Sequence, residues 1–118
     1  MDDVRRFALA LPGVTEGRSY GLPALLLNGK FFTRYRKEDD SVVITVGTML
    51  ERDFLLGHDP RVFFITDHYR NYAAVLVRLA TVSRATLETL LLDAWRRKAK
   101  KGQVLAFDAA QGAPRGTR

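Results

Sequence analysis

The sequence predicts an α+β domain, in which helices cover one face of an antiparallel sheet. Three observations lead to this fold class. Apolar residues recur at helical spacing near residues 3–11 and 84–100. Two apolar runs flank Asn28-Gly29, a strong signal for a two-residue hairpin turn. Alternating runs rich in β-branched residues, at 42–46 and 73–79, indicate further strands. The expected order is helix, three strands, helix, two strands, helix.

The first helix is expected over residues 3–11, because Val4, Phe7, Ala8 and Leu11 form one apolar stripe. Asp2 or Asp3 can cap its start, and Pro12-Gly13 ends it. Residues 14–20 then read as a polar connection.

The hairpin is expected to have strands over 23–27 and 30–36. A two-residue turn pairs Leu27 with Lys30, Leu26 with Phe31, Leu25 with Phe32 and Ala24 with Thr33. One face of the hairpin then carries a basic column, and the other face is nearly all apolar. The column consists of Lys30, Arg34 and Arg36, with Leu25, Leu27 and Phe32 beside it.

A charged turn at 37–40 leads to a third strand at 42–46, which completes a three-stranded antiparallel meander. Thr48 and Glu51 fit a capping box for a helix over 49–56, with Leu50 and Phe54 facing inward. Strands at 62–65 and 73–79 form a second hairpin, whose tip is 67–72.

A last helix is expected over 84–100, with Ser83 as its cap. Its buried stripe comprises Leu87, Leu90, Leu91, Ala94 and Trp95. Residues 1–101 are interpreted as one domain and 102–118 as a partly disordered C-terminal tail. Within that tail, Val104, Leu105 and Phe107 could still dock on the domain.

Composition narrows the function classes. The chain has 118 residues, no cysteine and a net charge of +6, so a disulfide or a thiolate metal site is excluded. No window approaches the ~18 apolar residues that span a bilayer, which argues against a membrane protein. The N-terminus does not resemble a signal peptide, so a cytoplasmic location is expected. The positive charge allows binding to nucleic acid, and a merely basic surface is the alternative.

No catalytic or metal-binding signature is found. His58 and His68 lie in different loops without a pairing motif. Neither a nucleophile elbow nor a glycine-rich phosphate loop occurs. The sequence therefore predicts a protein that is not an enzyme and needs no cofactor or metal.

The candidate nucleic-acid-binding residues lie mainly on the two hairpins. Cations beside aromatic rings suit phosphate contacts with stacking nearby. These residues are Lys30, Arg34, Arg36, Tyr69, Arg70 and Arg78. A further basic group at 96–101 is explained by the negative end of the helix dipole, with nucleic-acid contact as an alternative.

Several short motifs together resemble the MmcQ/YjbR family. They are Tyr20-Gly21-Leu22-Pro23-Ala24, Gly29-Lys30-Phe31-Phe32, His68-Tyr69, Val75-Leu76-Val77-Arg78-Leu79 and Ala94-Trp95-Arg96. The resemblance covers about residues 3–100. It implies a compact α+β fold similar to type III secretion chaperones. It also implies DNA binding through a double-wing arrangement of hairpins, with no catalytic residues and no obligatory cofactor. The family often has Trp before the VLVRL run, where this chain has Ala74.

Two functions therefore lead at the level of sequence, and an enzyme whose site carries no known motif is a third class left open. The first is sequence-independent binding to the phosphate backbone of DNA through the basic and aromatic hairpins. The alternative is a protein-interaction or chaperone-like module, dimeric through the hairpin face that carries Leu25, Leu27 and Phe32.

Overall fold

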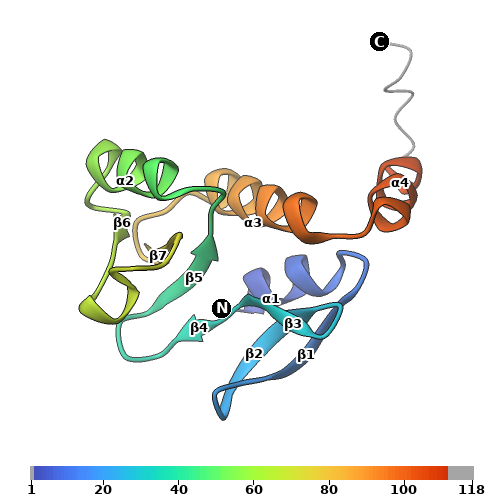
Figure 1. The fold of residues 1–118 in the computed structure, drawn as a ribbon, viewed down its shortest axis with the longest axis horizontal. Helices are drawn as coiled ribbons and strands as arrows, with labels where there is room; N and C mark the ends of the chain where they lie inside the picture. The colour runs from blue at the N-terminus through green and yellow to red at the C-terminus, as the bar shows by residue number, and fades with distance from the viewer. Residues whose placement is uncertain (1, 112–118) are drawn as a thin grey trace.

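The computed structural model describes residues 2–111 as an α+β domain with two antiparallel sheets (Figure 1). The helices are α1 (Asp2–Leu9), α2 (Met49–His58), α3 (Arg84–Lys98) and α4 (Lys101–Ala110), with a 3-10 turn η1 (Asp67–Tyr69). The strands are β1 (Val14–Ser19), β2 (Leu22–Leu27), β3 (Lys30–Thr33), β4 (Tyr35–Arg36), β5 (Ser41–Thr45), β6 (Phe63–Phe64) and β7 (Ala74–Arg78). The predicted fold class is confirmed.

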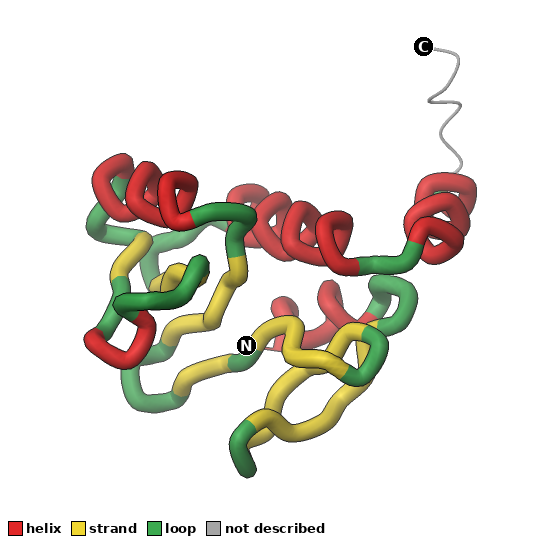
Figure 2. Tube along the Cα trace, in the orientation of Figure 1, coloured by secondary structure: helices red, strands yellow, loops and turns green. Residues whose placement is uncertain are grey.

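The strands form two separate sheets. Sheet A has the order β1-β2-β3, and sheet B has the order β4-β5-β7-β6. Figure 2 shows both sheets below the long helix α3. Helix α1 lies beside sheet A, and α2 lies above sheet B at the upper left of Figure 2. No helix within residues 2–111 is long and apolar enough to cross a membrane.

The main core lies between the sheets and the helices α1 and α3. Its largest fully buried side chain is Trp95, which is inaccessible to solvent. The Trp95 indole N–H donates a hydrogen bond of 2.8 Å to the Pro12 carbonyl, and its ring lies 5.1 Å from that of Phe107. The predicted stripe on α3 is confirmed for its buried members, while Leu90 is only partly buried.

The Asn28-Gly29 turn is confirmed, since both residues have positive φ, at 53° and 85°. The pairs Leu27–Lys30 and Leu26–Phe31 are also confirmed. A β-bulge then shifts the register, so Leu25 pairs with Thr33. The predicted pairs Leu25–Phe32 and Ala24–Thr33 are therefore wrong. The extra residue in β3 is Phe32, whose side chain is buried.

The strand predicted over 30–36 is two strands that belong to different sheets. The chain leaves sheet A after Thr33 and enters sheet B at Tyr35, with Arg34 between them. The Thr33 hydroxyl donates to the Val43 carbonyl at 2.7 Å, and the Val43 amide donates to the Arg34 carbonyl at 3.0 Å. These bonds tie the corner to β5, so the predicted meander is divided between two sheets.

Residues 14–19, predicted as a polar connection, form the edge strand β1 and pair with β2 along its whole length. Only Val14 of this strand is buried. A half-exposed edge strand needs few apolar residues, which explains why the pattern was missed. Its turn to β2 has positive φ at Tyr20 and Gly21, at 52° and 78°.

Helix α2 begins where predicted, because the Thr48 hydroxyl accepts a hydrogen bond from the Glu51 amide at 3.1 Å. The Glu51 carboxylate accepts from the Gly47 amide instead of completing the predicted box with Thr48. The predicted inward face is wrong: Leu50 and Phe54 are 81% and 66% exposed. Arg52 is buried on the inner face, where Leu55 and Leu56 pack against the core.

Residues 102–110, interpreted from sequence as tail, belong to helix α4. Val104 and Phe107 pack against the main core, as docking of the tail requires, whereas Leu105 is 62% exposed. The predicted disorder of 112–118 concerns residues outside those that the structure describes.

The replacement Trp95→Phe tests how far stability depends on this one residue. The variant loses the bond to Pro12 and part of the ring volume, so the free energy of unfolding should fall by about 2–3 kcal/mol. Urea denaturation measures this change. Leu50→Gln, at an exposed position, should stay within about 0.5 kcal/mol of the wild type. Equal losses in the two variants would contradict the central role of Trp95.

Candidate functional site

The structure distributes the six predicted nucleic-acid-binding residues over three places. Lys30 lies at the tip of the β2–β3 hairpin, and Arg34 lies at the corner between the sheets. Arg36 and Arg78 lie in sheet B, and Tyr69 and Arg70 lie in the η1 loop that connects β6 to β7. The predicted basic column is therefore interrupted.

Arg36 is engaged inside the molecule. Its guanidinium donates to the Asp39 carboxylate at 2.8 and 3.2 Å, and its side chain is 11% exposed. The Ser41 hydroxyl also donates to Asp39, at 2.6 Å. The hydrogen bond from Arg36 holds the pKa of Asp39 below its usual value, and the same bond raises the pKa of Arg36.

Arg36, Tyr69 and Arg78 come together on the face of sheet B that is turned away from the main core. Arg36 lies 5.6 Å from the centre of the Tyr69 ring, and Arg78 lies 4.0 Å from that of Phe64. Ser41 pairs with both arginines across the sheet. These groups surround a small buried cluster of Val43, Ala74 and Leu76. Their arrangement serves packing of this face.

The η1 loop is held by Arg52 of α2, a residue that no sequence motif singles out. One Arg52 nitrogen donates to the carbonyls of Arg70 at 2.7 Å and of Tyr69 and Tyr72 at 3.3 Å. This clamp satisfies backbone acceptors of a loop that has little regular structure. Arg70 itself is exposed and pairs with Asp67 at 2.9 Å.

The tip of the β2–β3 hairpin is locked to the start of α4. The Asn28 amide donates to the Gln103 side-chain oxygen at 3.0 Å, and the Gln103 amide donates back at 2.8 Å. Gln103 also accepts from the Lys100 backbone amide at 2.9 Å. Two amide side chains 75 residues apart carry no sequence signal of pairing, so this contact was not predicted.

This lock holds the turn that precedes Lys30 against the first turn of α4, which begins at Lys100 and Lys101. Lys30 is the cross-strand partner of Leu27, which faces the core, so its side chain projects toward the helical side of sheet A. On the other side of the Asn28–Gln103 contact, the chain carries Lys98, Lys100 and Lys101. We call these four lysines the basic tip.

The lysines of the basic tip form no ion pair with any carboxylate among residues 3–111. The neighbouring arginines are engaged, since Arg96 pairs with Asp108 at 2.9 Å and Arg97 donates to the Thr45 carbonyl at 2.8 Å. Partial burial, and then repulsion from Arg97, lowers the pKa of Lys98.

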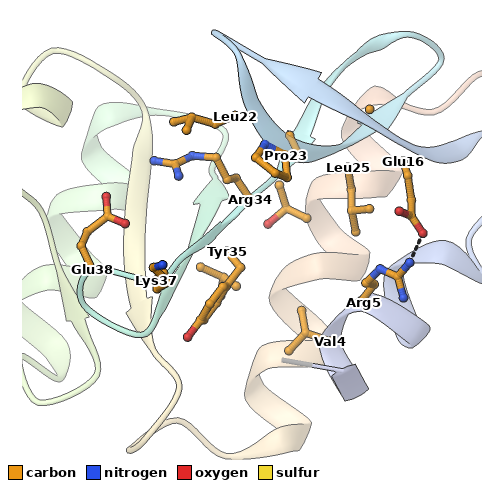
Figure 3. Close-up of a pocket in the computed structure, with 14 residues that line it drawn as sticks. Val4, Arg5, Glu16, Leu22, Pro23, Leu25, Arg34, Tyr35, Lys37 and Glu38 are labelled. Atoms are coloured by element: carbon orange, nitrogen blue, oxygen red, sulfur yellow. Dashed lines mark hydrogen bonds and ion pairs between the residues drawn. The ribbon is translucent and has the colours of Figure 1, made fainter.

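A pocket of about 540 Å³ lies at the corner where the chain crosses between the sheets (Figure 3). It is bounded by α1, β1, β2 and the segment from β3 to the turn after β4. Residues lining it include Val4, Arg5, Glu16, Leu22, Ala24, Leu25, Arg34, Tyr35, Lys37, Glu38 and Val42. Of the predicted site residues, Arg34 alone lines it.

No three potential metal ligands converge anywhere in the described part of the chain. His58 stacks on Phe54 at 5.5 Å, and His68 meets the edge of the Tyr69 ring at 5.0 Å. Both histidines are exposed and lie in different parts of the fold.

Two antiparallel sheets covered by α1 and α3 define a small α+β domain. A pocket lies where the chain crosses from one sheet to the other. The sequence model of the YjbR family matches residues 9–97. The chain therefore belongs to the YjbR family, which confirms the family resemblance seen in its motifs.

About half of the chain is similar to curated proteins that are named only as uncharacterized. They are uncharacterized proteins of Mycobacterium bovis and of two strains of Mycobacterium tuberculosis, each 45% identical over 58 residues. The match covers 49% of this chain and 45% of each relative, so it spans less than half of the relatives' length. No solved structure matches the chain significantly.

The replacement Asp39→Asn tests the partly buried ion pair with Arg36. Because the folded-state pKa of Asp39 is lowered, the ion pair stabilises the fold above the ordinary pKa of Asp, about 3.9. At pH 7 the variant should be less stable by about 1.5–3 kcal/mol. The difference should shrink as the pH falls through the folded-state pKa. Urea unfolding at several pH values measures it, and a difference independent of pH would contradict this role.

Proposed function

We propose that this chain binds the phosphate backbone of DNA without sequence readout, through the basic tip at the meeting point of the β2–β3 hairpin and the α3–α4 junction. The observation that supports the proposal is the reciprocal Asn28–Gln103 contact, which joins the turn next to Lys30 to the start of α4, where Lys100 and Lys101 lie. Lysines without carboxylate partners among residues 3–111 can exchange counterions for phosphates. The chain's charge of +6 favours the same partner.

The proposed interface is centred on the basic tip instead of the predicted basic column. Lys30 stays in it. Arg36 and Arg78 have partners inside the domain, which makes them poorer candidates for phosphate contact. Arg34 lines the corner pocket, whereas Tyr69 and Arg70 of the η1 loop remain predicted contacts on a separate surface.

Salt-dependent binding to a short DNA duplex tests the proposal. The observed affinity should fall with salt by close to ~0.9 log unit per log unit for each phosphate contact. The triple variant Lys30→Gln/Lys100→Gln/Lys101→Gln should lower this slope by roughly 2–3 units. Fluorescence anisotropy at several salt concentrations measures both quantities.

A matched variant separates a specific surface from overall charge. Arg6→Gln/Arg61→Gln/Arg84→Gln removes the same charge from arginines that already pair with Asp3 or Asp59. It should keep nearly the wild-type slope. Equal losses in the two triple variants, or no binding by the wild type at low salt, would overturn the proposal. Arg70→Gln alone reports on the predicted second hairpin, where one contact should lower the slope by about 0.9.

A second candidate is self-association, which the exposed apolar face of α2 supports. Leu25, Leu27 and Phe32, on which the predicted dimer face depended, are buried within the domain. Leu50 and Phe54 instead are 81% and 66% exposed. Neighbouring exposed apolar side chains on one helix face are typical of protein contact surfaces.

Sedimentation of the full chain over a range of concentrations tests the second candidate. Self-association through α2 should give a mass that rises with concentration. The Leu50→Glu/Phe54→Glu variant should remain monomeric, because the charges cannot be desolvated in a contact. Leu105→Glu, on α4, provides a control of the same chemistry and should behave as the wild type. A wild-type chain that is monomeric at every concentration would rule the candidate out.

A further inference from the structure

The corner pocket carries an inference that is independent of DNA binding. Its volume, about 540 Å³, falls within the roughly 300–1,000 Å³ of pockets that hold small organic molecules. It exists because Arg34 sits between two sheets, which therefore diverge on either side of it. The pocket is thus built by the fold and does not depend on one flexible loop.

The inner surface of the pocket is apolar. Val4, Ala24, Leu25 and Val42 line it, and all four are buried side chains of the core. Leu22, at the rim, is 46% exposed. An apolar ligand body would fill the space beside these side chains and take the exposed Leu22 out of water, which stabilises the bound state.

Most polar groups of the pocket already have partners. Arg5 forms an ion pair with Glu16 on one side of the pocket in Figure 3. The Tyr35 hydroxyl donates to Asp40 at 2.7 Å, which raises the pKa of Tyr35. The Thr33 hydroxyl is bonded to the Val43 carbonyl. These polar groups therefore shape the pocket, but they already have partners and are poor candidates for binding a ligand.

Two cations at the pocket differ from these polar groups. Within residues 3–111, the side chains of Arg34 and Lys37 form no hydrogen bond or ion pair. Figure 3 shows both on the side opposite the Arg5–Glu16 pair, near Glu38. Glu38 itself lies 3.8 Å from Arg36. Three cations and two carboxylates line the pocket, which leaves one positive charge in excess.

We propose that the corner pocket binds a small carboxylic acid with an apolar body. The apolar body lies against Val4, Ala24 and Leu25, and the carboxylate is held by Arg34 and Lys37. Arginine suits a carboxylate, because its planar guanidinium can donate two parallel hydrogen bonds. A single excess positive charge matches a monoanion better than a doubly charged phosphate ester. The exposed Glu38 adds repulsion against a second negative charge.

An NMR titration of the ¹⁵N-labelled full chain with octanoate tests this proposal. Saturable shifts are expected for amides that line the pocket, such as those of Gly17, Ala24 and Arg34. Octanol, with the same body and no charge, should bind at least about tenfold more weakly, because the bond to the guanidinium is charge-assisted. Arg34→Gln should weaken octanoate binding by a similar factor while leaving octanol binding unchanged.

Control variants distinguish loss of a pocket cation from loss of a cation elsewhere on the surface. Arg61→Gln removes a cation whose side chain is 86% exposed and which lies outside the pocket, so its octanoate affinity should equal that of the wild type. Lys37→Gln repeats the test on the second cation if Arg34→Gln disturbs the fold. Equal affinities for octanoate and octanol would overturn the proposal. So would the absence of saturation, or shifts confined to the exposed face of α2.

Discussion

The crossing of the chain between its two sheets is the constraint on which the rest of the structure depends. The Thr33 hydroxyl and the Arg34 carbonyl both bond to Val43, so the end of β3 is fixed against the middle of β5. Because the strand changes sheets here, sheet A turns away from sheet B and leaves room for α1 and for the pocket. The same change carries Arg36 to the far face of sheet B, where Asp39 receives it.

Arginines and lysines have different roles in this domain. The arginines at 36, 52, 78 and 97 bind a carboxylate, backbone carbonyls or an aromatic ring of the same molecule. The planar guanidinium allows this, since it offers several directed donors and stacks on rings. The lysines of the basic tip remain outside such contacts. Counting positively charged residues in the sequence is therefore a poor guide to where a polyanion could bind, because several of the arginines already bind groups of the same molecule.

The fold class, the hairpin turn at Asn28-Gly29 and the buried stripe of α3 could be predicted, because each depends on local periodicity or on turn chemistry. The bulge at Phe32 and the sheet change at Arg34 could not, because tertiary packing decides them. The inward face of α2 was misjudged, since Arg52 behaves as a buried residue only when the carbonyls of the η1 loop surround it. At the site, the sequence predicted Lys30 and Arg34 as members of one basic column, which the sheet change at Arg34 interrupts. The neighbours of each residue depend on contacts distant in sequence.

The bond from Trp95 to Pro12 joins residues 83 positions apart and has a consequence for synthesis of the chain. During translation, α1 and the hairpins leave the ribosome well before Trp95 can reach them. Their apolar faces stay uncovered until the segment after residue 95 has emerged, since distant contacts cannot form earlier. Closure of the core therefore has to wait until α3 has been synthesised.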